Sequence, residues 1–301
     1  MKKMLFVFNP NSGKARIKNK LVEIVQIFSN AGYDVTVYPT KARMDGYKYM
    51  IENMHNYDIV TCSGGDGTLN ETVSAVLSCS DKKMPIGYIP SGSTNDFANS
   101  LSIPKDMELA AEYIVEGSLF SCDIGMVNKE KYFCYVAAFG AFTEVSYLTP
   151  QYLKNMLGHQ AYILEAAKSL AALKPYYIRV TADGHKVEGE YVYGMISNTE
   201  SVGGVKGLAG SSVDLQDGLF EVTLVKKISG PMEFQQLVTA FLTQNYDESG
   251  SIFSIKAKHI EVECGEGVNW TLDGEFGGEH RNITFDVVPG AVEFMMKQKT
   301  K

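Results

Sequence analysis

The stretch Ser63-Gly64-Gly65-Asp66-Gly67-Thr68 decides the fold of this chain. An apolar run at residues 59–62 leads into it, and residues 69–77 follow with apolar side chains at helical spacing. The pattern predicts a strand, a glycine-rich turn and the start of a helix. Glycines let the backbone take positive φ and let a ligand approach closely. The N–H groups at a helix start favour phosphate.

Asp66 is unusual in a loop that would bind phosphate, because its charge would repel a bare anion. We expect the carboxylate to act through a metal ion, a bound water or a sugar hydroxyl. The alternative is structural: a tight strand–helix turn in which Asp66 is the helix N-cap.

Composition limits the class of protein. The chain has 301 residues, 45% hydrophobic and 21% charged, with a net charge of −7. The length suggests two domains, and the charge disfavours nucleic-acid binding. No apolar run reaches the roughly 20 residues of a membrane helix. Five cysteines without a CxxC pair indicate buried thiols in a reducing cytosol. We therefore expect a cytoplasmic protein without a transmembrane segment.

The first part of the chain alternates between predicted strands and helices. Strands are predicted at residues 4–8, 34–38, 58–62 and 85–89. The alternation predicts a mostly parallel sheet that is covered on both faces. Ligands bind such sheets at the carboxyl ends of the strands. Polar loops follow three of these strands, at residues 9–14, 64–68 and 91–96, so we expect them on one edge.

Past about residue 120 short strands dominate. They are predicted at residues 119–127, 132–138, 176–182, 186–197, 219–225, 254–262, 268–272 and 282–288. Helices are predicted at residues 151–173 and 231–242. This half of the chain is typical of an antiparallel β-sandwich.

The first and third polar loops each allow a functional and a structural interpretation. In the first loop, Lys14 could reach a nucleotide phosphate, or the segment is only a turn. The third loop carries many hydroxyl and carboxyl groups before a helix. These groups could belong to a nucleotide site, or the loop could be a capping segment with Asn95 or Asp96 at the N-cap.

Two carboxylate clusters lie in the second half. Asp214 and Asp217 form an oxygen-rich loop that suits Mg²⁺, or a surface turn. Asp273 and Glu275 flank a glycine after the strand that holds Trp270. They could form only a hairpin turn, or they could supply a general base.

Taken in order, six motifs resemble the diacylglycerol kinase catalytic-domain family. The similarity is greatest to the soluble bacterial lipid kinases related to sphingosine kinases. The motifs are Asn9-Pro10-Asn11-Ser12-Gly13, Gly64-Gly65-Asp66-Gly67-Thr68-Leu69-Asn70-Glu71, Ile89-Pro90-Ser91-Gly92-Ser93-Thr94-Asn95-Asp96-Phe97-Ala98, Cys122-Asp123-Ile124-Gly125, residues 214–219 and Leu272-Asp273-Gly274-Glu275.

This resemblance implies an α/β + β fold. Residues 1–125, with a return of the chain at about 288–301, would form a mostly parallel α/β domain like that of NAD kinase and phosphofructokinase. Residues 126–287 would form an antiparallel β-sandwich domain that takes the lipid. The active site would lie in the cleft between the two domains.

The resemblance also implies the site residues. Those that would bind ATP are Asn9, Ser12, Gly13, Lys14, Gly64, Gly65, Asp66, Gly67, Thr68, Glu71, Ser93 and Asn95. The acidic network that holds Mg²⁺–ATP would be Asp66, Asp96 and Asp123.

In the second domain, Asp273 resembles the catalytic base, and Glu275 would support it. Asp214, Asp217 and the carbonyl of Leu219 resemble a second, structural Mg²⁺ site.

The implied activity is transfer of the γ-phosphate of ATP to a lipid hydroxyl, with diacylglycerol giving phosphatidic acid as the first choice. The enzyme would meet its lipid transiently at the inner face of a membrane. The sequence leaves the oligomeric state open, a homodimer included. The alternatives are another lipid or sphingoid base as acceptor, an NAD kinase, and a catalytically silent nucleotide-binding regulator on the same fold.

The chain departs from the family pattern at several positions. Ser93 and Thr94 replace the usual threonine and glycine, and Asn99, His159 and Glu165 stand where members carry basic residues. Each lost cation weakens attraction to an anionic membrane by about 1 kcal/mol. The departures therefore bear on the lipid more than on phosphoryl transfer. We expect residues 139–142 and 147–162 to line the acceptor pocket, or most of their side chains to form the core of the second domain.

Overall fold

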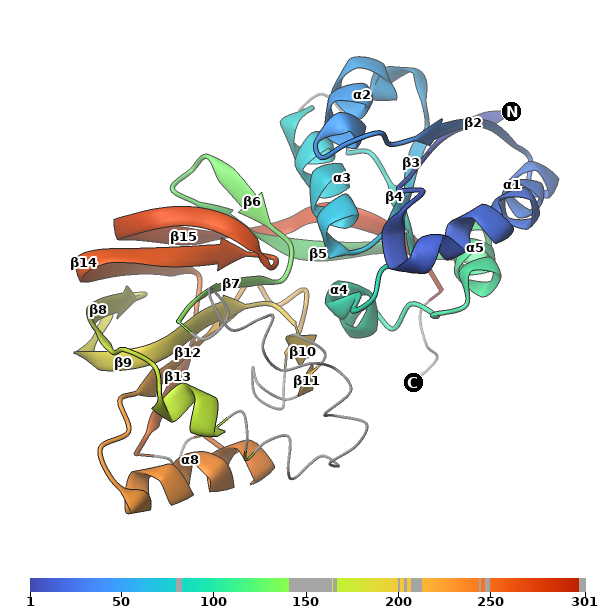
Figure 1. Cartoon of the computed structure of the whole chain (residues 1–301). Helices are drawn as coiled ribbons and strands as arrows, with labels where there is room; N and C mark the ends of the chain where they lie inside the picture. Colours follow the sequence, from blue (N-terminus) through green and yellow to red (C-terminus); the bar gives the residue numbers. More distant parts are fainter. Residues whose placement is uncertain are drawn as a thin grey trace. The chain divides into compact units, whose positions relative to one another are not determined.

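The computed structural model describes residues 1–79, 83–140, 164, 167–199, 201–202, 205–206, 213–243, 245–246 and 250–297. The chain divides into two compact units, Met1–Ile124 with Val288–Lys301, and Gly125–Val287. It passes from one unit to the other within strands β5 (Ser118–Val127) and β15 (Glu275–Met296). Figure 1 labels the elements.

The first unit is built on a parallel sheet with the strand order β2-β1-β3-β4, and the end of β15 pairs with β4. The strand bounds are β1 Lys2–Phe8, β2 Tyr33–Pro39, β3 Ile59–Gly64 and β4 Ile86–Pro90. Every residue of β3 and β4 is buried. Continuous burial of this kind is typical of strands that are covered on both faces.

Helices lie on both sides of this sheet. Helices α1 and α5 contact each other, and α2 contacts α3, as Figure 1 shows. The bounds are η1 Ser12–Asn19, α1 Leu21–Asn30, α2 Asp45–Asn53, η2 Met54–Asn56, α3 Asp66–Ser78, α4 Asp96–Ser100 and α5 Met107–Glu116. The Asp106 carboxylate caps α5 by accepting the N–H of Leu109 at 2.9 Å.

The second unit is antiparallel. Its strands pair in the order β13-β12-β9-β7-β14-β15, and β8 pairs with both β9 and β14. The bounds are β6 Lys131–Phe133, β7 Val136–Phe139, β8 Tyr176–Ala182, β9 His185–Ser197, β10 Ser201–Val202, β11 Val205–Lys206, β12 Phe220–Lys226, β13 Ile252–Ala257 and β14 His259–Leu272. Helix α8 spans Pro231–Thr243.

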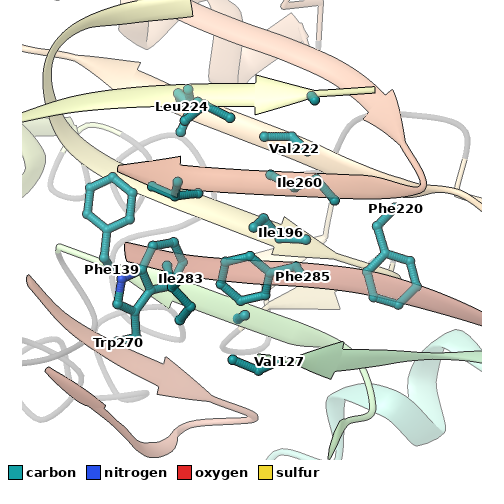
Figure 2. Packing of buried hydrophobic residues seen from close by; sticks show 14 of the residues in the cluster. Val127, Phe139, Ile196, Phe220, Val222, Leu224, Ile260, Trp270, Ile283 and Phe285 are labelled. Atoms are coloured by element: carbon teal, nitrogen blue, oxygen red, sulfur yellow. The ribbon is translucent and has the colours of Figure 1, made fainter. Parts of the chain in front are cut away.

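Long strands enclose the core of the second unit. The first half of β9 pairs with β8, and its second half pairs with β7 and β12. Trp270 belongs to this core, with its ring centroid 5.1 Å from that of Phe139 and 4.9 Å from that of Phe285. Figure 2 shows these rings packed with aliphatic side chains from the facing strands. Such close packing fixes the strand register, which positions the polar side chains described below.

The predicted fold class, an α/β part followed by a β-sandwich, is confirmed. The strand bounds differ at the end of the chain. The segments predicted at 254–262 and 268–272 are instead β13 and one long strand, β14, whose register shifts between Glu263 and Val268. Strand β15 has 22 residues, whereas only 282–288 were predicted.

Some predictions lie outside the described residues. They concern His159, Glu165 and the acceptor-pocket residues 141–142 and 147–162, together with most of the helix predicted at 151–173. Residues 164 and 167–171 of that segment are helical.

Candidate active site

Three loops at the carboxyl ends of β1, β3 and β4 are bonded to one another through their backbones. The N–H of Asn9 donates to the carbonyl of Ser63 at 2.9 Å. The N–H groups of Ser91 and Gly92 both donate to the carbonyl of Gly64, at 2.8 and 3.2 Å. The three polar loops predicted on one edge therefore touch.

Glycines make this contact possible. A Cβ on Gly13, where φ is +50°, would lie 1.8 Å from the carbonyl oxygen of Ser91. A Cβ on Gly92 would lie 2.5 Å from the Cα of Gly65. Both distances are far shorter than a carbon atom allows, so these loops can approach only through glycine.

Helix α3 begins directly after the glycine loop. Its N-cap is Gly65, and no side chain caps the first turn. Gly67 is exposed, and a Cβ there would have no atom within 4 Å. Free N–H groups at a helix start, with space in front of them, are the usual setting for a phosphate group. This turn therefore has the geometry of a site for a phosphate group.

The Asp66 carboxylate has a defined partner in the third loop. It accepts the N–H of Asp96 at 3.3 Å and the N–H of Phe97 at 3.4 Å, at the start of α4. Asp66 therefore joins the glycine loop to the third loop. This contact accounts for a carboxylate in a glycine turn, because its charge is directed at backbone N–H groups.

The third loop is closed by Asn95, whose φ is +54°. Its side-chain oxygen accepts the N–H of Gly92 at 3.0 Å, and its amide donates to the carbonyl of Gly92 at 2.9 Å. Asn95 is the N-cap residue of α4 but makes no side-chain capping bond. Asp96 is buried, whereas Ser93 is exposed and can reach a ligand.

In the first loop, the side-chain oxygen of Asn9 accepts the N–H of Asn11 at 2.9 Å, which shapes the turn. The hydroxyl of Ser12 lies 3.8 Å from the position that a Cβ on Gly65 would occupy. Lys14 is exposed and has a φ of +64°. This loop therefore lies against the glycine loop and leaves the Lys14 ammonium free to move to a phosphate.

Glu71 binds the loop that precedes α2. Its carboxylate accepts the N–H of Met44 at 2.7 Å, and Met44 has a φ of +61°. Burial raises the pKa of Glu71, and the N–H bond from Met44 opposes that rise. Glu71 thus fixes the loop before α2.

The three carboxylates of the predicted acidic network have different partners. The Asp66 carboxylate accepts the backbone N–H of Asp96, a contact in which the Asp96 carboxylate takes no part. The carboxylate of Asp123, which is 1% exposed, accepts the N–H of Gly290 on β15 at 2.7 Å. Among the described residues, no three acidic, histidine or cysteine side chains are grouped as a direct metal site.

In the second unit, Asp273 and Gly274 form the two-residue turn between β14 and β15, with φ values of +50° and +83°. The Asp273 carboxylate accepts three N–H bonds, from Cys134 at 2.6 Å, Tyr135 at 3.0 Å and Val136 at 3.1 Å. Asp273 is only 5% exposed. Its carboxylate therefore ties the turn to the start of β7.

The next carboxylate along the chain is accessible. Glu275 is exposed at the start of β15, and the adjacent Phe276 is 68% exposed. The turn thus holds one carboxylate against the backbone and presents the other to solvent.

The predicted structural metal site contains a lysine that sequence reasoning missed. The Asp214 carboxylate accepts the N–H of Gln216 at 3.0 Å. The Asp217 carboxylate accepts the N–H of Leu219 at 3.0 Å and the ammonium of Lys256 at 2.9 Å. Because Lys256 already supplies positive charge at Asp217, this donor set does not fit a divalent ion unless the lysine moves.

Lys256 also pairs with Glu221, at 3.3 Å. Glu221 is 5% exposed, and burial raises the pKa of its carboxyl to about 7, although Lys256 opposes the rise. A signal for Glu221 was present in the sequence, because it is a charged residue within the apolar strand 219–225.

Within the described part of the chain, no helix has the length and apolar character needed to cross a membrane.

The comparisons with known proteins agree with this architecture. Residues 3–127 match the diacylglycerol kinase catalytic domain. Residues 138–296 match the YegS C-terminal NAD kinase beta sandwich-like domain. The chain therefore belongs to the diacylglycerol kinase catalytic-domain family.

Curated relatives cover almost the whole chain. The diacylglycerol kinase of Bacillus subtilis strain 168 is 36% identical over 280 residues, which are 92% of this chain and 91% of the relative. The diacylglycerol kinase of Staphylococcus aureus strain MRSA252 is 33% identical over 279 residues, 92% of this chain and 87% of the relative. A Bacillus anthracis crystal structure, provisionally described as a diacylglycerol kinase, has a TM-score of 0.83 at 25% identity, covering 98% of this chain and 95% of that one.

Proposed function

We propose that this protein transfers the γ-phosphate of ATP to a lipid hydroxyl, and that diacylglycerol is the acceptor, giving phosphatidic acid. The observation that carries the proposal is the uncapped start of α3, packed between two other glycine-containing loops. It occurs in a chain whose relatives over 92% of its length are named diacylglycerol kinases.

ATP would bind along the edge formed by the three loops. The phosphates would lie on the backbone N–H groups at the start of α3, with Lys14 and Ser93 able to reach them. Asn9, Ser12, Glu71 and Asn95 would act by holding the loops in place, since their described contacts are with backbone or neighbouring loops.

Magnesium would accompany the nucleotide. Carboxylate oxygens suit this hard cation, and the bond from the Asp96 N–H to the Asp66 carboxylate holds these two acidic residues next to each other in the chain fold. When bound, Mg²⁺ would neutralise phosphate charge. Asp123 would act through water, because one of its oxygens already accepts the N–H of Gly290.

We assign proton transfer to Glu275. The lipid hydroxyl oxygen forms a bond to the γ-phosphorus, the bond from that phosphorus to the bridging oxygen breaks, and ADP leaves with the electron pair. The hydroxyl proton passes to the Glu275 carboxylate, which is exposed. Asp273 acts as a positioning residue, because three backbone N–H groups already bind its carboxylate. This assignment reverses the roles that the family resemblance implies for the two carboxylates.

The test uses purified protein, Mg²⁺ and γ-labelled ATP with three acceptors: dioctanoylglycerol in mixed micelles, sphingosine and NAD. Label in phosphatidic acid is expected. Label in sphingosine phosphate or in NADP instead would show that the acceptor is sphingosine or NAD and not diacylglycerol. ATP binding without label in any acceptor would indicate a silent nucleotide-binding protein.

Binding to a membrane follows from the choice of acceptor, since diacylglycerol resides in bilayers. We propose transient, peripheral binding at the cytoplasmic face. Sedimentation with vesicles that contain diacylglycerol, compared with vesicles that lack it, measures this directly.

A further inference from the structure

A row of neighbouring side chains crosses four strands of the second unit. Val136 on β7 pairs with Ser197 on β9, Ser197 pairs with Glu221 on β12, and Glu221 pairs with Lys256 on β13. Side chains of directly paired antiparallel residues point to the same face of a sheet. Four residues that are far apart in sequence therefore share one face.

This face is not the sandwich core. The adjacent residues on three of these strands, Ala137, Ile196 and Val222, belong to the core cluster, and Figure 2 shows Ile196 and Val222 within it. Because successive side chains alternate between faces, Ser197 and Glu221 point away from that core. Thr223, two residues beyond Glu221, shares their face.

Several polar side-chain atoms on this face are buried and make no hydrogen bond to a described residue. Ser197 is 0% exposed, Thr223 1% and Glu221 5%. The Ser197 hydroxyl, the Thr223 hydroxyl and one Glu221 oxygen have no hydrogen-bond partner in the structure as described. A buried polar group without a partner costs about 1–3 kcal/mol, so two such hydroxyls on the same face of the sheet point to a ligand.

The charges of the row favour a neutral ligand. Lys256 pairs with Glu221 at 3.3 Å and with Asp217 at 2.9 Å, so the carboxylate of Glu221 already has a counter-charge. Apart from the second oxygen of Glu221, the groups on this face without a partner among the described residues are the hydroxyls of Ser197 and Thr223, which can donate. A carbonyl oxygen accepts such bonds but cannot donate one.

The row begins beside the candidate catalytic turn. Val136 donates its N–H to the Asp273 carboxylate, and its carbonyl accepts the N–H of Asp273 at 2.8 Å. With strands spaced about 4.8 Å apart, Ser197 lies two strands, or roughly 10 Å, from that turn. The side-chain hydroxyls of Ser197 and Thr223 are thus placed to bind a group of the acceptor that lies close to the lipid hydroxyl that reacts.

We propose that Ser197 and Thr223 bind the ester carbonyls of an acylglycerol acceptor. This inference rests on the proposed lipid kinase activity and names the residues that bind the glycerol ester groups. Because these hydroxyls are buried, the bonds form away from water, where the loss of one hydrogen-bond partner costs the most free energy.

The test compares dioctanoylglycerol with the diether analogue, which has the same glycerol hydroxyl but lacks both ester carbonyls. Ser197→Ala and Thr223→Val should each raise KM for the diester about five- to tenfold with kcat nearly unchanged, as expected for one lost hydrogen bond. Neither variant should change KM for the diether. Thr181→Val, which removes a hydroxyl from β8 in the same unit, is the matched control and should change neither value.

Thermal unfolding of the free protein supplies a second readout. Ser197→Ala and Thr223→Val should melt at or above the wild-type temperature, because each removes a buried hydroxyl without a partner. A clear fall in melting temperature would overturn the proposal, since the hydroxyl would then serve the fold. Equal KM changes for diester and diether, or no change for either, would also overturn it. Failure of the wild-type protein to phosphorylate both lipids would instead refute the lipid kinase activity itself, and this inference with it.

Discussion

The two units carry their candidate functional groups in opposite ways. In the first unit the groups are backbone atoms of three loops, each loop a short contiguous motif after a parallel strand. In the second unit they are side chains: Glu275 after the turn between β14 and β15, and a buried set on one face of an antiparallel sheet, brought together from β9 and β12.

This difference teaches where each unit is sensitive to substitution. A backbone cradle tolerates changes of side chain but not the addition of a Cβ where loops touch. A side-chain row depends on strand register, because a slip of one residue would turn every member to the other face. The predictions below test this contrast.

The largest expected effect is on Glu275, the residue of the second unit to which proton transfer is assigned. Glu275→Gln should lower kcat roughly 10²–10⁴-fold, the range for loss of a positioned base. The melting temperature should stay unchanged, because the side chain is exposed. Lipid phosphorylation is measured alongside Glu279→Gln, an exposed residue of the same strand, as the control. Full activity of Glu275→Gln would return the role of base to Asp273.

Gly13 tests the backbone cradle. Gly13→Ala should destabilise the fold by about 2–5 kcal/mol, because a Cβ would clash with the Ser91 carbonyl at a positive φ. Denaturant unfolding measures this loss. Gly67→Ala is the contrasting variant, because a Cβ there meets nothing. It should keep or raise stability while weakening ATP binding, and unaltered ATP affinity would argue against phosphate at the start of α3.

Asp273 separates positioning from catalysis. Asp273→Asn should lower the free energy of unfolding by about 1–3 kcal/mol, because an amide cannot accept all three N–H bonds that the carboxylate receives. Part of the activity should remain in the folded fraction. A variant with native stability and no turnover would show that the carboxylate acts on the substrate itself.

The smallest effect concerns pH and His259. A hydrogen bond to Asp286 at 2.6 Å, together with Glu261, raises the pKa of His259. Because the folded pKa lies above the unfolded value of about 6.5, this stabilisation is fully present below that pH and is lost as pH rises through the folded pKa. His259→Asn should therefore melt below wild type at about pH 5.5 and nearly level with it at about pH 9. A pH-independent difference would remove His259 as the cause.

Strand prediction succeeded where the pattern was local. The strand predicted at 58–62 appears as β3, Ile59–Gly64, and the helix predicted at 231–242 appears as α8, Pro231–Thr243. It failed for β14, because the polar and glycine-rich segment from Glu263 to Gly267 looks like a loop. Pairing of Cys264 with β8 and of Val268 with β15, on either side of the register shift, keeps the strand continuous.

The sequence by itself determined the three glycine-containing loops and their strand–loop–helix setting. The reason is that glycine freedom and helix starts are properties of a few consecutive residues. Only the tertiary structure decided that Asp273 is held by the backbone of 134–136, and that Ser197, Glu221 and Thr223 share a buried face. Those relations depend on the register between strands up to 139 residues apart, and the packing of the whole sandwich sets that register.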